Sequence, residues 1–238
     1  MAKDNIIGRV RTRLKNEILY AKLSLWTHLV YYKRSCKGGM KKPPKGDFCD
    51  LAVIAFNNAR LIEYQICTLR RFFAYPFRYT VFDNSTMKEK AREIEEVCSR
   101  YVVGYVRLPG QAYLPKDMGS YSHGIACNYA YRHFIRNGGG KFFVLLDHDI
   151  FPVEAFDITA FLARQPFYGV KHGFYLWPGF FFVSMDWAGK KNLDFRPSLH
   201  LHGDTGACNY YSLFKDVDFS HYDLAKSVHV CPDGHSDV

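Results

Sequence analysis

The stretch FFVLLDHDIFP, residues 142–152, runs from five apolar residues directly into two carboxylates and then a proline. The apolar run predicts a buried strand, with Asp147 and Asp149 at its carboxyl end. Two carboxylates this close repel each other, and removal from water raises the cost further. A divalent metal, a cationic substrate or full exposure to solvent would each relieve it. The pair therefore marks a candidate site whose chemistry depends on the surrounding sequence.

Segments typical of strands and of helices alternate upstream of this motif. Predicted strands cover 50–56, 77–85, 101–108 and 141–146, and predicted helices cover 59–73, 87–101 and 120–136. This order predicts an α/β fold with a mostly parallel central sheet flanked by helices. Ligands of such sheets bind at the carboxyl ends of the strands. We therefore expect Asn57, Asp83 and the 147/149 pair to share one cleft.

Basic residues concentrate at the N-terminal end. The 238 residues carry a net charge of +9, but residues 1–46 hold twelve Lys or Arg against two acids, and the rest of the chain holds twenty against twenty-one. We therefore divide the chain into a basic N-terminal helix and linker, 1–46, and a nearly neutral domain, 47–238. The neutrality of the domain argues against nucleic acid as a partner.

Within residues 5–32, apolar side chains recur every three or four positions, as in an amphipathic helix. They are Ile6, Val10, Leu14, Ile18, Ala21, Leu25, Leu29 and Tyr32, and a second set, Leu19, Leu23, Trp26, Val30 and Tyr31, widens the apolar face. Such a helix either lies on an anionic membrane surface or docks on the domain or another subunit. Its most apolar run contains Lys22 and His28, so we expect no membrane span. The Lys-, Gly- and Pro-rich segment 36–48 is predicted to be a linker.

Seven cysteines are scattered without the spacing of a zinc site, and no signal peptide is recognisable. The cysteines are typical of reduced thiols, and both observations predict a cytoplasmic protein. The basic helix would then place this protein on the surface of a membrane.

Three segments that end near the predicted cleft form a recognisable set: DLAVIAFNN (50–58), VFDNST (81–86) and GSYSHGIACNYAYRHFIRNGGGKFFVLLDHDIFP (119–152). Together they resemble the nucleotide-sugar-binding half of GT-A glycosyltransferases, especially the family 2 type. The resemblance covers residues 50–152 and implies a GT-A fold, with an acceptor-binding half in residues 153–238.

The resemblance implies that the nucleotide is contacted by Asp83 at the nucleoside, by Asn57 or Asn58 in the loop facing the base, and by Asn128 on the helix before the fourth strand. Where the family often has an arginine before this last asparagine, the chain has Cys127. His123 is the candidate replacement, and helix packing is its alternative.

The resemblance also implies that Asp147 and Asp149 form a D-x-D pair on the diphosphate, with Asp149 the more direct ligand of Mn²⁺ or Mg²⁺. A hard divalent cation would neutralise the charge that develops on the leaving diphosphate. Candidates for a third metal ligand are late histidines: His200, His202, His221, His229 and His235.

The second polar segment is LHLHGDTGACNYY, residues 199–211. An inverting transferase needs a carboxylate to accept the proton of the acceptor hydroxyl, and Asp204 is the candidate base. Its flanking glycines would let the backbone approach a ligand. The alternative for Asp204 is the N-cap of a helix beginning near Thr205, and a retaining mechanism would need no such base.

The sequence thus predicts a metal-dependent glycosyltransferase that moves a sugar from a nucleotide-sugar donor to a glycan or lipid-linked acceptor. The alternative is a non-catalytic nucleotide-binding module of the same fold, recruited to membranes by the basic helix. Asp-Thr-Gly at 204–206 is also the signature of aspartic proteases, but the β/α alternation opposes that class. A phosphatase of the haloacid dehalogenase type would carry its aspartate pair after the first strand, whereas here it follows the fourth.

Overall fold

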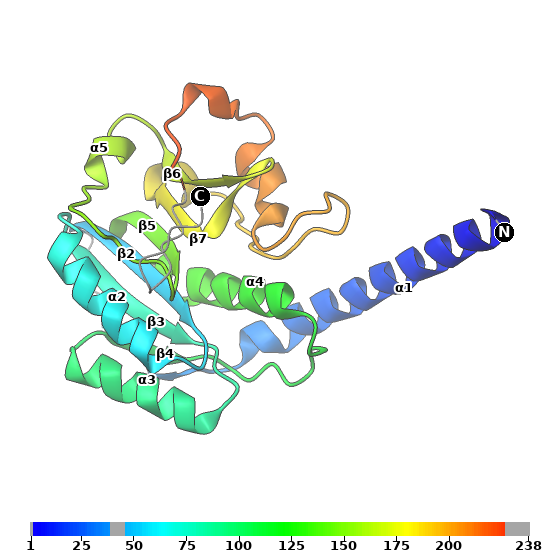
Figure 1. Ribbon diagram of the computed structural model, residues 1–238, viewed down its shortest axis with the longest axis horizontal. Helices are drawn as coiled ribbons and strands as arrows, with labels where there is room; N and C mark the ends of the chain where they lie inside the picture. Colours follow the sequence, from blue (N-terminus) through cyan, green and yellow to red (C-terminus); the bar gives the residue numbers. More distant parts are fainter. Residues whose placement is uncertain (1, 39–45, 227–238) are drawn as a thin grey trace.

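The computed structural model describes residues 2–38 and 46–226, and the side chains from Val10 onward (Figure 1). A seven-stranded sheet has the order β1-β4-β3-β2-β5-β7-β6. Its strands are β1 (Lys37–Gly38), β2 (Gly46–Ala55), β3 (Phe77–Asp83), β4 (Gly104–Arg107), β5 (Gly140–Asp147), β6 (Phe167–His172) and β7 (Tyr175–Ser184). Neighbours within β4-β3-β2-β5 run parallel, whereas β1, β6 and β7 pair antiparallel. The predicted α/β fold with a mostly parallel core is confirmed.

The helices are α1 (Ala2–Leu29), α2 (Ala59–Phe72), α3 (Lys88–Arg100), α4 (Gly119–Ala130), α5 (Thr159–Leu162) and α6 (Met185–Ala188). Shorter helical turns are η1 (Tyr31–Lys33), η2 (Tyr131–Ile135), η3 (Ala207–Asn209), η4 (Tyr210–Phe214) and η5 (Phe219–His221). Helices α2 and α3 lie on one face of the sheet and α4 on the other (Figure 1). This is the expected covering of a parallel sheet by helices on both faces.

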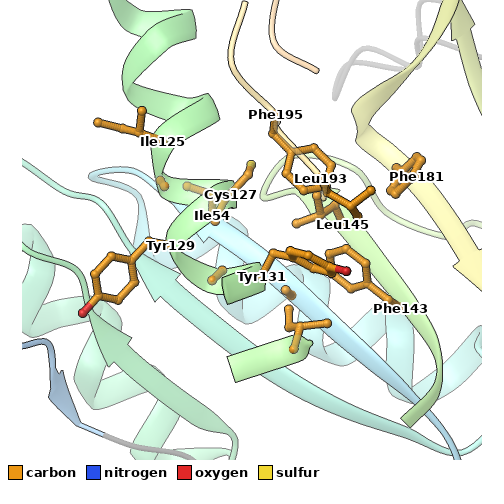
Figure 2. Packing of buried hydrophobic residues seen from close by; sticks show 14 of the residues in the cluster. Ile54, Ile125, Cys127, Tyr129, Tyr131, Phe143, Leu145, Phe181, Leu193 and Phe195 are labelled. Atoms are coloured by element: carbon orange, nitrogen blue, oxygen red, sulfur yellow. The ribbon is translucent and has the colours of Figure 1, made fainter. Parts of the chain in front are cut away.

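The two faces of the sheet build two apolar cores. Because side chains alternate along a strand, Leu51 and Val53 pack toward α2 and α3, and Ala52 and Ile54 pack toward α4. Figure 2 shows the second core, in which Ile125 and Cys127 of α4 and Tyr131 of η2 lie over the sheet. The helix predicted at 120–136 is present, but it is α-helical only as far as Ala130 and continues as the π-helical turn η2 from Tyr131.

Residues 36–48, which the sequence predicts to be a linker, are described by the structure at their two ends. Their described ends are strands, since Lys37 and Gly38 pair with β4 and residues 46–48 begin β2. The linker prediction is wrong at both ends, and residues 39–45 lie outside the described part of the chain. Each of the six cysteines that the structure describes is a free thiol.

The second half of α1 packs on the domain, while its first half extends away from it (Figure 1). Leu23 and Thr27 are buried, and so are Tyr31 and Tyr32 of η1. Docking on the domain, one of the two expected arrangements of this helix, is therefore present along its C-terminal turns.

Helix α4 approaches the 194–196 segment so closely that Gly124 has no room for a side chain. A Cβ there would lie 2.5 Å from the carbonyl oxygen of Phe195 and 2.8 Å from the Cα of Arg196. We expect Gly124→Ala to lower the free energy of unfolding by about 1–3 kcal/mol, measured by denaturant titration, because the backbone must shift.

The matched control is Gly119→Ala at the start of the same helix, where a Cβ would meet nothing within 4 Å. Alanine is the better helix former at either position. A Gly124→Ala protein as stable as the Gly119→Ala protein would contradict this close approach.

Candidate active site

A cavity of about 860 Å³ opens at the carboxyl ends of the parallel strands. Its lining combines strand ends, the loop after β4 and the first turn of α4. The lining residues are Ile54, Phe56, 84–86, 107–112, 114–116, 118, 119, Ser122, His123 and 147–149. The volume is in the range of small-molecule sites. The expected position of the cleft is therefore correct.

Asp147 and Asp149 both line this cavity. Asp147 ends β5, and its Oδ1 lies 3.2 Å from Nε2 of His123 on α4. Burial raises the pKa of Asp147, the imidazole of His123 lowers it, and the charge of Asp149 raises it again, with a net increase. Asp149 is exposed. The structure thus holds one desolvated carboxylate beside one open carboxylate in the same cavity.

This donor set fits a hard divalent cation. Magnesium and similar ions are commonly bound by one or two carboxylates, with substrate phosphates and water completing the shell. Within residues 2–38 and 46–226, no group of three or more His, Cys, Asp or Glu side chains could hold a metal. His200, His202 and His221 are exposed and outside the lining, and His229 and His235 lie outside the described residues.

Asp83 does not line the cavity. It is fully buried, and its carboxylate accepts hydrogen bonds from the Tyr105 hydroxyl (2.8 Å) and the Ser85 backbone N–H (2.9 Å). Arg107 contacts the same carboxylate at 3.1 Å and donates to the carbonyl oxygen of Asp83 at 3.0 Å. The structure places Asp83 beneath residues 84–86, which line the cavity, and the nucleoside contact of Asp83 stays a prediction.

The two loop asparagines are also occupied by the fold. Asn57, at φ 51°, accepts a hydrogen bond from the backbone N–H of Thr86 at 3.1 Å, which joins the loops after β2 and β3. Asn58 caps α2 by accepting from the backbone N–H of Leu61 at 3.2 Å. Neither lines the cavity, whereas the preceding Phe56 does. The prediction that Asn57 or Asn58 faces a base is not supported by these positions.

Asn128 lies in the core under α4. Its amide nitrogen donates to Asp194 (2.8 Å) and to the Tyr32 hydroxyl (2.9 Å), and its oxygen accepts from the Phe195 backbone N–H (2.8 Å). Burial opposes ionisation of Asp194, but the hydrogen bonds from Arg196 and Asn128 outweigh it and lower its pKa. In this structure Asn128 is a buried bridge between α4, Tyr32 and residues 194–195, and its nucleotide contact stays a prediction.

The loop between β4 and α4 is the part of the site that the sequence reasoning missed. Gln111 donates to the Asn84 side chain at 2.9 Å and to the Tyr31 hydroxyl at 3.2 Å, and its own oxygen is buried with no partner among the described residues. Lys116 brings a cation into the lining. The available signal was the length of this aperiodic segment, because long loops in compact domains are often functional.

Asp204 is not part of the cavity lining. It is exposed, and its carboxylate accepts from the backbone N–H of Thr205 at 2.7 Å. The Thr205 hydroxyl donates to the carbonyl oxygen of Ser120, next to Gly119 of the lining. The N-cap position of the following turn is Gly206, so the N-cap alternative for Asp204 is wrong.

The glycines around Asp204 are explained by internal packing. A Cβ at Gly203 would lie 2.4 Å from that of Ala207, and one at Gly206 would lie 2.6 Å from Pro178. Gly206 also has φ 91°, a conformation that favours glycine. Close approach of a ligand is therefore not needed to account for them.

No family model and no curated protein matches the chain. Among solved structures it is similar to the mannosyltransferase PcManGT from Pyrobaculum calidifontis, in complex with GDP-Man and Mn²⁺. The identity is 14%, the match covers 76% of this chain and 55% of that one, and the TM-score is 0.43. It is also similar to TarS of S. aureus, with 18% identity, coverage of 53% and 21%, and a TM-score of 0.34.

The chain thus spans about half the length of the first structure and about a fifth of the second.

We expect Asp147→Asn to stabilise the protein at neutral pH without metal or nucleotide. The folded-state pKa of Asp147 is raised, so ionisation costs stability as the pH rises from the ordinary carboxyl value through the folded value. Asparagine avoids this cost, and the gain should vanish in acid, where the carboxyl is protonated in both states. Thermal unfolding across a pH series, with a chelator present, measures the difference.

Asp149→Asn is the matched control, because its carboxylate is exposed and should change stability little. An Asp147→Asn protein less stable than the wild type at neutral pH would show that the contact with His123 outweighs desolvation.

Proposed function

We propose that the chain is a metal-dependent glycosyltransferase that moves a sugar from a nucleotide-sugar donor to a glycan or lipid-linked acceptor. The observation that carries the proposal is the pair Asp147 and Asp149, both open to one cavity at the carboxyl ends of parallel strands. The cavity is large enough for a small-molecule ligand and carries the acidic donors that a cation on a diphosphate requires.

In this proposal Asp149 is the main metal ligand, because it is the exposed member of the pair. Asp147 is the second, and its desolvated carboxylate gains most from a nearby cation. His123 holds Asp147 from the α4 side. The metal, when bound, would supply charge neutralisation for the leaving diphosphate.

The rest of the lining offers separate surfaces for the other parts of a donor. Phe56 and Met118 supply apolar surface suited to a base or ribose, and Lys116 supplies a cation suited to phosphate. Arg107 donates to the carbonyl oxygens of Asp83 and Ser85, so we assign it to shaping the 84–86 loop.

Asp204 stays the candidate base of an inverting reaction. Its loop is joined to α4 through the contact between Thr205 and Ser120, the residue after Gly119 of the cavity lining. An exposed carboxylate beside the donor cavity can receive the proton of an acceptor hydroxyl that enters from solvent. The cytoplasmic location and peripheral membrane association remain predictions from the sequence.

The second candidate is a nucleotide-binding module without turnover. It would use the same cavity and the same acidic pair, Asp147 and Asp149, and it needs no catalytic base, which agrees with the position of Asp204 outside the cavity lining. Calorimetry with UDP and GDP, with and without Mn²⁺, followed by a donor-hydrolysis assay, separates the two. Binding without hydrolysis or transfer selects the module.

Asp149→Asn should reduce transfer by about 100-fold or more, since loss of metal-based stabilisation costs several kcal/mol in the transition state. It should also abolish the Mn²⁺-dependent rise in melting temperature produced by the donor nucleotide. Glu154→Gln is the matched control, because Glu154 is a nearby exposed acid outside the lining. Undiminished turnover by Asp149→Asn would refute the metal role.

Asp204→Asn should lower kcat by about 10²–10⁴-fold and leave donor binding unchanged, as expected for loss of a general base. Asparagine keeps the acceptor oxygen that contacts the Thr205 backbone. Steady-state kinetics with donor affinity measured separately gives both quantities. If kcat is unaffected, Asp204 is not the base, and a retaining mechanism becomes the better description.

A further inference from the structure

Helix α1 has one face that the domain covers. Leu23 and Thr27 are buried there, and Ser24 accepts a hydrogen bond from Arg196 at 2.6 Å. The Tyr20 ring meets Tyr121 edge-on at 5.5 Å. These contacts use one side of the helix and fix its orientation on the domain.

The other side carries an apolar stripe that nothing in the described chain covers. Five residues on this side are 47–62% exposed, and we call them the free stripe: Val10, Leu14, Ile18, Leu25 and Leu29. At 3.6 residues per turn they fall within a sector of roughly 100°, about opposite Leu23 and Thr27. Single exposed leucines are ordinary, but five in one row form a patch of the kind found at interaction sites.

Positive charge borders the free stripe. Arg11, Lys15 and Lys22 are exposed and lie along one edge of it by the same helical spacing. Residues 10–29 contain four Lys or Arg and a single acid, Glu17. Glu17 and Arg13, paired Nε to Oε1 at 3.1 Å, lie beside the opposite edge by the same spacing, so the edge with Arg11, Lys15 and Lys22 keeps its positive charge.

We propose that the free stripe of α1 is a docking surface for an anionic phospholipid bilayer, on which the helix lies flat. Apolar residues in a row with Lys and Arg beside them match an acyl boundary under anionic headgroups. No helix within the described residues is long and apolar enough to cross a bilayer. Contact along the surface is therefore the geometry that this helix offers.

Charge argues against the other occupants. A second copy of α1 packed on the stripe would bring two positive edges together without acids to pair them. A nucleic acid would use the charges but leave the apolar row in water. An anionic bilayer satisfies both features of the same face.

The face of α1 that packs on the domain also contacts a loop of the cavity wall. The rings of Trp26 and Tyr113 are in contact, tilted by 34° with centroids 3.7 Å apart, and Thr27 contacts the Tyr113 hydroxyl at 3.2 Å. Tyr113 lies in the loop whose neighbours line the cavity. Helix α1 would thus contact the bilayer with one side and the loop of the cavity wall with another.

The test is flotation of the full chain with vesicles of phosphatidylcholine plus phosphatidylserine, and with phosphatidylcholine alone. We expect binding to the anionic vesicles that weakens with added salt. Leu14→Gln with Leu25→Gln should weaken it about tenfold or more through lost apolar burial. Lys15→Gln with Lys22→Gln should weaken it about fivefold per charge.

Leu19→Gln is the matched control, because Leu19 is an exposed leucine of α1 outside the free stripe and should leave binding unchanged. All the variants keep good helix formers at exposed positions, so circular dichroism should show intact folding. Equal binding by the wild type and the Leu14/Leu25 variant would overturn the proposal. So would sedimentation showing a wild-type dimer that this variant converts to a monomer. Neither readout depends on the proposed transfer reaction.

Discussion

The parallel pairing of β2 with both β3 and β5 is the constraint on which the site depends. Its register places Asp147 beside Ile54 and Asp83 beside Ala55, so both acids reach the same edge of the sheet. Neighbours in register point to the same face, and successive residues point to opposite faces. Asp147 therefore shares the α4 face with Ile54, while Asp83 shares the opposite face with Ala55. Because their partners on β2 differ by one residue, Asp147 lies in the cavity and Asp83 lies in the core.

The buried polar residues show how the fold uses groups that look like ligand contacts. Asp83 and Asn128 each satisfy several donors or acceptors that would otherwise be left without partners inside the protein, a costly state. Asn57 and Asn58 satisfy backbone N–H groups at a loop and at a helix start. Short polar side chains suit both structural and binding roles, and only their surroundings distinguish the two.

The N-terminal helix combines two surfaces that the sequence presents as one. Its apolar residues form two sets. One set, which includes Leu23, is buried against the domain together with Tyr31 and Tyr32 of η1. The remaining set keeps the three-to-four spacing and stays exposed beside basic residues. The helix is thus firmly attached to the domain and still offers an unoccupied face, so any surface that binds this face also orients the cavity.

The sequence by itself determined the alternation of strands and helices, the position of the cleft at the strand ends, and the acidic pair Asp147 and Asp149. Apolar periodicity and strand order are local properties that parallel pairing converts directly into a location. Tertiary structure alone decided which polar residues reach the cavity. Asp83, Asn57 and Asn128 are bound by partners from other segments, and Asn58 caps its own helix, while the loop with Gln111 and Lys116 lines the cavity in their place. That outcome depends on the face each strand residue presents and on hydrogen bonds between separate segments, neither of which a local pattern encodes.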